Sequence, residues 1–175
     1  MNELCELKFY GVSLYHPIGW KIVSTPNSRC SFQEGEIKLE NITITSESEI
    51  SLSLRWATMK NIISEQDYLS ELEKTFLLQE KRSKGKDKYK IKDTIEVTNH
   101  RDQVYISISE IYANHSILNI FKKSESITMI QGVYFSVKTK RILMAIISSR
   151  TTNFDANKLF FIDIVSSLSE SLEGI

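Results

Sequence analysis

The chain has 175 residues, of which 41% are hydrophobic and 25% are charged. This composition excludes a disordered or low-complexity protein, and the length suits one domain spanning residues 1–175. Because 22 basic residues balance 22 acidic ones, the molecule as a whole carries no net charge that would attract nucleic acid or an anionic membrane.

The N-terminal residues and the cysteines indicate the compartment. No run approaches the ~18–20 apolar residues that a membrane-spanning helix needs. Met1–Cys5 has neither the basic leader nor the apolar segment of a secretory signal. We therefore expect a cytoplasmic protein, exported only if a leader is missing from this sequence. A fold of this size needs no disulfide, so Cys5 and Cys30 are expected to be free thiols.

Strand patterns fill the first third of the chain. Residues 7–15 and 20–23 flank His16-Pro17-Ile18-Gly19, where proline and glycine favour a turn, so these two segments are predicted to form a hairpin. Residues 37–44 and 50–56 alternate apolar and polar side chains with period two, which predicts a second hairpin.

The period then changes to that of a helix over residues 64–82. Ser64 with Asp67 is typical of an N-cap, and acidic residues in a first turn favour the helix dipole. Tyr68, Leu72 and Phe76 recur every four residues and give the helix one apolar side.

Strand patterns return over residues 88–97, 104–112, 118–122, 127–138 and 141–149. Ile142–Ile147 is apolar on both faces, which predicts a central strand that is covered on both sides. A second helix follows, with Asn153 or Asp155 as its cap, and its apolar side includes Phe161, Val165, Leu168 and Leu172.

This order contains no alternation of strand, helix and strand, so the sheet should be mainly antiparallel. We predict the α+β class: an α/β/α sandwich whose sheet of six to eight strands carries one helix on each face.

Three local sequences carry a resemblance to a known family. They are a Tyr-x-Pro-x-x-Trp turn at Tyr15–Trp20, a Ser-acid-x-x-Tyr-Leu helix start at Ser64–Leu69, and a terminal Phe-x-x-Ile-Val-x-Ser-Leu pattern at Phe161–Leu168. With the order of elements, which covers nearly the whole chain, they resemble the PsbP-like family. That family comprises the extrinsic photosystem II protein, its non-photosynthetic relatives and the Ran-binding nuclear-import factor of the same fold.

The resemblance implies a non-catalytic accessory or binding domain. The chain departs from the family pattern at residues 98–102, where relatives often have an Asn/Asp-Gly turn and this sequence has no glycine. The resemblance does not transfer photosynthetic function or Ran binding, since none of the residues for those roles can be matched.

Catalytic and metal-binding patterns are weak. His16, His100 and His115 have no cysteine or carboxylate at convincing metal-ligand spacing, and a nucleophilic pair of Cys30 with His16 would still need an orienting group. All six glycines are isolated, so no phosphate-binding loop is present. We expect no cofactor, no metal and no enzymatic activity.

One segment, residues 81–92, is unusually basic. It is a candidate site for an anion or a protein partner, or it is a solvated helix end that continues into an edge strand, where lysines discourage edge-to-edge pairing. Tyr89 is a candidate aromatic surface contact; Trp20 is another, although a tryptophan in a strand, like Trp56, more often packs in the core. The basic residues of this segment are Lys81, Arg82, Lys84, Lys86, Lys88, Lys90 and Lys92.

The sequence thus favours a domain that binds another protein. The first alternative is binding of nucleic acid or another polyanion through residues 81–92. The second is a small-ligand or enzymatic domain with a pocket between the sheet and a helix.

Overall fold

The computed structural model describes residues 3–23, 30–41, 50–61, 64–84, 86–98, 103–113 and 126–171. The strand predicted at 118–122, His100, His115 and Leu172 lie outside the described residues. The elements in chain order are β1 (Leu4–Phe9), β2 (Val12–Pro17), β3 (Trp20–Val23), β4 (Gly35–Asn41), β5 (Ser51–Thr58), α1 (Glu65–Arg82), β6 (Asp87–Thr98), β7 (Gln103–Ala113), β8 (Ser126–Ser136), β9 (Arg141–Arg150), α2 (Thr151–Ser166) and β10 (Ser169–Glu170).

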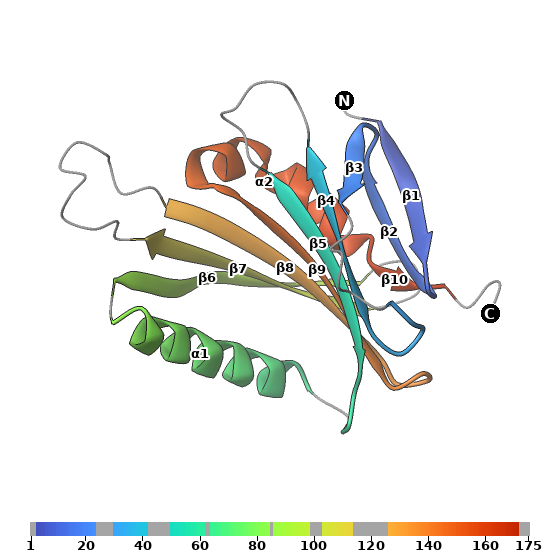
Figure 1. The fold of residues 1–175 in the computed structure, drawn as a ribbon, viewed down its shortest axis with the longest axis horizontal. Helices are drawn as coiled ribbons and strands as arrows, with labels where there is room; N and C mark the ends of the chain where they lie inside the picture. Colours follow the sequence, from blue (N-terminus) through green and yellow to red (C-terminus); the bar gives the residue numbers. More distant parts are fainter. Residues whose placement is uncertain are drawn as a thin grey trace.

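The strands form two antiparallel sheets (Figure 1). The larger sheet has seven strands in the order β3-β4-β5-β9-β8-β7-β6, and the smaller has the order β1-β2-β10. The predicted hairpin of β4 with β5 is confirmed, and β9 lies at the centre of the large sheet, as its apolar sequence predicted. No helix among the described residues is long and apolar enough to cross a membrane.

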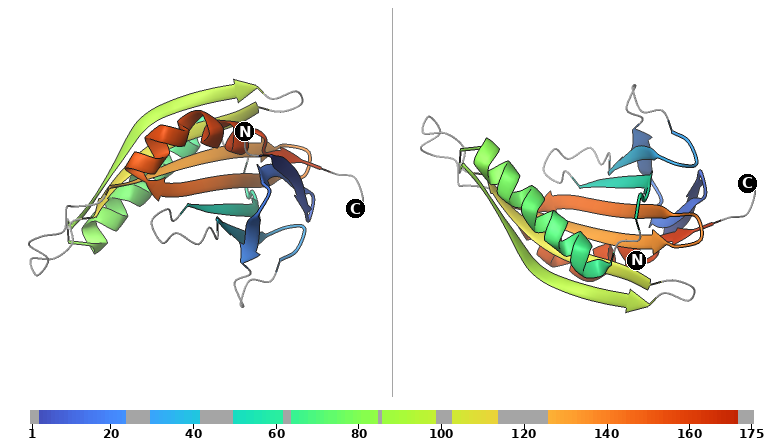
Figure 2. Two further views of the ribbon diagram at one scale, coloured as in Figure 1. Left: turned by 90° about the horizontal axis from the view of Figure 1, so that it is seen from above. Right: turned by 90° about the horizontal axis from the view of Figure 1, so that it is seen from below.

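The two helices cover opposite faces of the large sheet (Figure 2). Successive residues of a strand point to opposite faces, and Gln131 and Gly132 of β8 illustrate this. The Gln131 side chain accepts a hydrogen bond from Tyr68 of α1 at 2.5 Å, whereas Gly132 lies against Val165 of α2. The α+β sandwich with one helix on each face is therefore confirmed.

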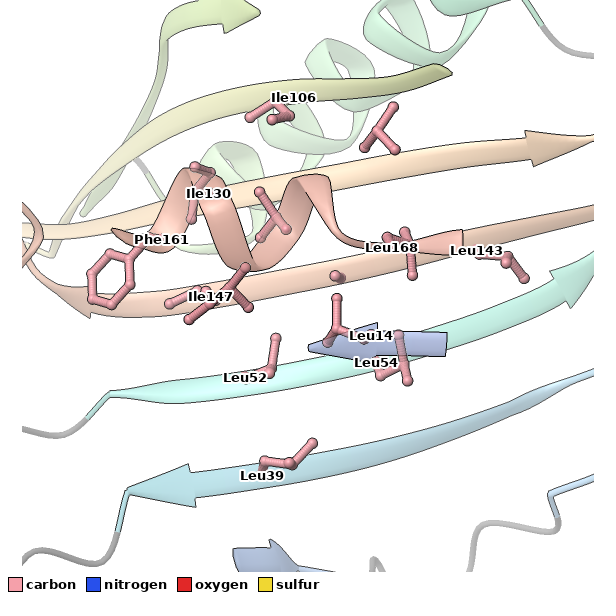
Figure 3. Packing of buried hydrophobic residues seen from close by; sticks show 14 of the residues in the cluster. Leu14, Leu39, Leu52, Leu54, Ile106, Ile130, Leu143, Ile147, Phe161 and Leu168 are labelled. Carbon is pink, nitrogen blue, oxygen red and sulfur yellow. The ribbon is translucent and has the colours of Figure 1, made fainter. Parts of the chain in front are cut away.

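The main hydrophobic core lies on the α2 face. Figure 3 shows these buried side chains, to which Leu14 of the small sheet and Leu168 after α2 also belong. Alternate β9 residues such as Leu143 and Ile147 are completely buried here, whereas Met144 and Ile146, on the α1 face, are only half-buried. β9 is thus covered on both faces, as predicted, but less completely on the α1 face than on the α2 face.

The predicted start of α1 at Ser64 is confirmed. Ser64 is the N-cap: its Oγ accepts a hydrogen bond from the Asp67 backbone N–H at 3.2 Å, and the Asp67 carboxylate accepts one from the Ser64 N–H at 3.1 Å. This reciprocal pair is a capping box.

The predicted hairpin of residues 7–15 with 20–23 is wrong. The chain reverses earlier, at Tyr10 and Gly11, whose positive φ angles of 47° and 75° are those of a type I′ turn, and β1 pairs with β2. Pro17 ends β2, and Gly19, at a φ of 98°, directs the chain into the other sheet, where β3 pairs with β4.

The second helix also differs from its prediction at both ends. It begins at Thr151, so Asn153 and Asp155 lie inside the helix and neither is its cap. The N-cap position is occupied by Arg150, which makes no side-chain cap bond. It ends at Ser166 instead of continuing to Leu172, because the next residues return to a strand: Ser169 pairs with Ser13 of β2.

A buried ion pair fastens β10 to the rest of the molecule. Arg141 is 1% exposed and donates to the Glu170 carboxylate at 2.6 Å. Its guanidinium also donates to the carbonyls of Tyr10, Gly11 and Phe32, and it stacks 3.8 Å from the centre of the Phe32 ring. One side chain therefore joins the β1–β2 turn, β9, β10 and the segment that precedes β4.

The contact of Gly132 with α2 predicts a strong effect of a single methyl group. A Cβ at this position would lie 2.7 Å from the Val165 carbonyl oxygen, which is helix backbone and cannot rotate away. Gly132→Ala should therefore lower the free energy of unfolding by roughly 1–3 kcal/mol, as measured in urea. Thr94→Ala on exposed β6 is the control, and equal stability of the two variants would contradict this packing.

The Arg141–Glu170 pair predicts a dependence of stability on its two partners and on pH. Burial alone would raise the pKa of Glu170, but hydrogen bonds from Ser136, Thr139 and Arg141 outweigh it and hold this pKa below its usual value. Arg141→Met, which leaves a buried carboxylate unpaired, should cost about 3–5 kcal/mol at about pH 7. The double variant Arg141→Met/Glu170→Met should cost less than the two single losses added together.

Because the pKa of Glu170 is lower in the folded chain, its contribution is present above its ordinary pKa and is lost as the pH falls through the folded value. Urea unfolding at about pH 7 and about pH 3 should thus show a smaller acid-induced loss in the double variant than in the wild type. An identical loss in both proteins would contradict this role for Glu170.

Candidate functional site

The basic segment, residues 81–92, lies where α1 meets the sheet edge. Lys81 and Arg82 are in the last turn of α1, and β6, which follows, is an edge strand of the large sheet. Lys92 forms an ion pair with Glu110 of β7. The other six cations are exposed and form no ion pair with another described residue: Lys81, Arg82, Lys84, Lys86, Lys88 and Lys90.

These six cations surround the edge and do not share one flat face. Tyr89 points to the α1 side, where its ring stacks on Phe76 with centroids 5.2 Å apart and planes 26° apart. The alternation of a strand therefore directs Lys88 and Lys90 to the opposite side of the sheet. A bulge between Ile91 and Asp93 reverses this pattern, so that the rest of β6 contributes apolar side chains to the core on the α2 side.

The two predicted aromatic contacts, Tyr89 and Trp20, are both half-buried. Tyr89 is half-buried against Phe76, and burial raises the pKa of its phenol, with smaller effects from Asp87 and Glu80. Trp20 is half-buried in β3 and packs against the core. Trp56 is 2% exposed and donates from its indole to the Ser31 carbonyl at 2.7 Å, which confirms it as a core residue.

Two exposed leucines of α1 lie close to the basic segment in the sequence. Leu77 is 58% exposed and Leu78 is 54% exposed, although they belong to the last turns of a helix whose buried residue is Phe76. The end of α1 thus presents apolar and cationic side chains together.

A cavity of about 470 Å³, called here the α1 cavity, lies between α1 and the half-buried face of the sheet. Tyr68 and Gln131 form its hydrogen-bonded pair, and burial raises the pKa of the Tyr68 phenol far above its usual value. A pocket between sheet and helix was among the sequence alternatives, but none of its residues was identified. The lining residues are Arg55, Tyr68, Glu71, Leu72, Thr75, Phe76, Gln79, Tyr89, Ile111, Met129, Gln131, Met144 and Ile146.

The cysteines and His16 lie apart from the α1 cavity, and both cysteines are free thiols, as expected. Cys5 and His16 are cross-strand partners, with Sγ 3.3 Å from Nε2, whereas Cys30 contacts the Glu36 carbonyl at 3.6 Å. The imidazole neighbour is therefore Cys5, so the Cys30–His16 pair considered from the sequence does not form. Within the described ranges, no group of three histidine, cysteine or acidic residues could hold a metal ion.

The sequence matches no family model and no curated protein. Solved structures do match. The solution structure of cyanobacterial PsbP (CyanoP) from Synechocystis sp. PCC 6803 superimposes with a TM-score of 0.68 at 11% identity, over 97% of this chain and 94% of that one. The chain has the PsbP fold.

Two other structures have the same arrangement. The Ran-binding protein Mog1p of Saccharomyces cerevisiae matches with a TM-score of 0.63 at 10% identity, over 97% of this chain and 96% of its own. PA94 of Pseudomonas aeruginosa, a protein of unknown function described as a putative regulator, matches at 0.54 and 8% identity, over 95% and 96%. These superpositions establish the PsbP fold, and because the identities are 11% or less, the function has to be argued from the chain's own surface.

Proposed function

We propose that the chain is one non-catalytic protein-binding domain that acts in the cytoplasm and holds an acidic surface of its partner against the basic segment. The observation that carries this proposal is the set of six exposed cations around the edge strand that form no ion pair with another described residue. Two of them, Lys81 and Arg82, follow the exposed Leu77 and Leu78 by one helical turn. Unpaired cations raise the rate of association with an acidic partner. Exposed apolar side chains stabilise the complex because their surface is removed from water on binding.

One structural neighbour supports a protein partner. Mog1p, which has the same fold, is a Ran-binding protein. A fold alone does not transfer a partner, so the acidic character of the partner rests on the charges of this chain.

Nucleic acid is the alternative partner for the same cations. Binding of single strands normally combines a cationic groove with aromatic rings on which bases stack. Tyr89, the aromatic residue within the basic segment, stacks on Phe76 instead. Lys88 and Lys90 also point away from the α1 side, so the cations do not line one continuous groove. The arrangement therefore favours a protein partner.

The test compares two charge-reversal variants of the tagged chain in native lysate. Lys84→Glu/Lys86→Glu/Lys88→Glu alters the basic segment, and Lys21→Glu/Lys60→Glu/Lys138→Glu alters three exposed lysines elsewhere by the same net charge. We expect the wild type and the control to retain one stoichiometric partner, and the first variant to bind that purified partner about tenfold or more weakly.

Two results would contradict the proposal. One is equal binding of the partner by both variants. The other is turnover of a substrate by the isolated chain in hydrolase and phosphatase panels. Salt-dependent binding of labelled RNA at about 50 mM salt, lost in the first variant and without a protein partner, would favour the nucleic-acid alternative.

A further inference from the structure

The floor of the α1 cavity contains a buried amide with an incomplete set of hydrogen bonds. Gln131 is 5% exposed, and its Oε1 accepts the Tyr68 hydroxyl. Its Nε2 carries two donor hydrogens, and the partner of this nitrogen among the described residues is the Met129 sulfur at 3.5 Å. A thioether is a weak acceptor, so the cavity floor offers donor capacity that the protein does not use.

Two further polar atoms in the same layer lack partners. Ser107 and Ser109 of β7 are register partners of Gln131 and Met129, so their side chains lie on the same face of the sheet. Both serines are at most 2% exposed, and neither hydroxyl has a hydrogen-bond partner among the described residues. Unsatisfied polar atoms therefore gather under α1, where an apolar core would cost less.

The walls of the α1 cavity are mainly apolar, with Thr75 and Gln79 as further uncharged polar residues. Both charged lining residues already have an ion-pair partner: Arg55 pairs with Glu36 at 2.8 Å and Glu71 with Lys74 at 2.6 Å. An ionised ligand would therefore find no unpaired counter-charge among the lining residues. The apolar walls include two flexible methionines, which adapt to ligands of different shape. These walls are Leu72, Phe76, Ile111, Met129, Met144 and Ile146.

We propose that the α1 cavity binds an uncharged amphiphile, with an apolar body between α1 and β9 and one acceptor oxygen, such as that of a ketone, ester or amide, hydrogen-bonded to Gln131 Nε2. The volume of about 470 Å³ falls within the roughly 300–1,000 Å³ of small-molecule sites, which typically join apolar walls to a few polar groups. This site shares Tyr89 with the basic segment, but none of the cations of that segment lines it, so it does not depend on the proposed protein partner.

The experiment uses 2-decanone as the neutral probe and decanoate as its anionic counterpart, in isothermal titration with the full chain. We expect saturable one-to-one binding of 2-decanone and at least about tenfold weaker binding of decanoate, whose charge would be desolvated without a partner. Met144→Trp, which fills the cavity, should abolish binding, with Ile146→Phe as a second filling variant if the first does not fold by circular dichroism.

The head group is tested by Tyr68→Phe/Gln131→Met, which removes the amide and the hydroxyl bonded to it together and leaves neither without its partner. This variant should bind 2-decanone about fivefold more weakly. The Lys84→Glu/Lys86→Glu/Lys88→Glu variant is the matched control and should bind it normally, which separates this site from the proposed protein interface.

Three results would overturn the inference. If 2-decanone shows no saturable binding to the wild type, the α1 cavity holds only water. If both filling variants fold and bind as the wild type does, the probe occupies another place. If the Tyr68/Gln131 double variant keeps full affinity, the amide does not recognise the acceptor.

Discussion

The close approach of α2 to β8 at Gly132 sets the architecture of this protein. Helix backbone lies against strand backbone there, with no room for a side chain on the sheet. This contact brings Phe161, Ile164 and Val165 into the dense core on one face. The other face receives the alternate residues of the same strands, and α1 packs mainly on β6 and covers the centre incompletely. The α1 cavity is thus the counterpart of the dense side.

Much of this fold could be predicted because its signals are local. The period-two alternation of β4 and β5 and the cap of α1 at Ser64 each depend on a few neighbouring residues. The hairpin assigned to residues 7–23 failed for a long-range reason. Pro17 and Gly19 do produce a turn, but pairing with β4 decides which sheet β3 joins. The two-residue β10 could not be predicted either, because its position depends on contacts with β2 and Arg141, which are distant in the sequence.

The two candidate sites also differ in how far they could be predicted from local sequence. Clustered lysines are rarely buried, so the exposure of the basic segment follows from its composition. The segment also lies at a helix end that continues into an edge strand, which is the placement considered from the sequence. The bulge that turns Tyr89 towards α1 gave no sequence signal that we recognised. The α1 cavity depends on strand register, which places Ser107 beside Gln131 although they are distant in sequence. Serines that alternate along a strand indicate a solvent-exposed face of the sheet, whereas here a helix, α1, covers that face.

The Arg141 cluster has a consequence for biosynthesis. Its guanidinium holds the carbonyls of Tyr10 and Gly11, and β2 completes its sheet only with Ser169 and Glu170. β1 and β2 can pair with each other as soon as both are synthesised, whereas the second edge of β2 finds its partner, β10, only much later in the chain. Such non-local pairing slows folding, and one edge of β2 stays unpaired until β10 has been synthesised.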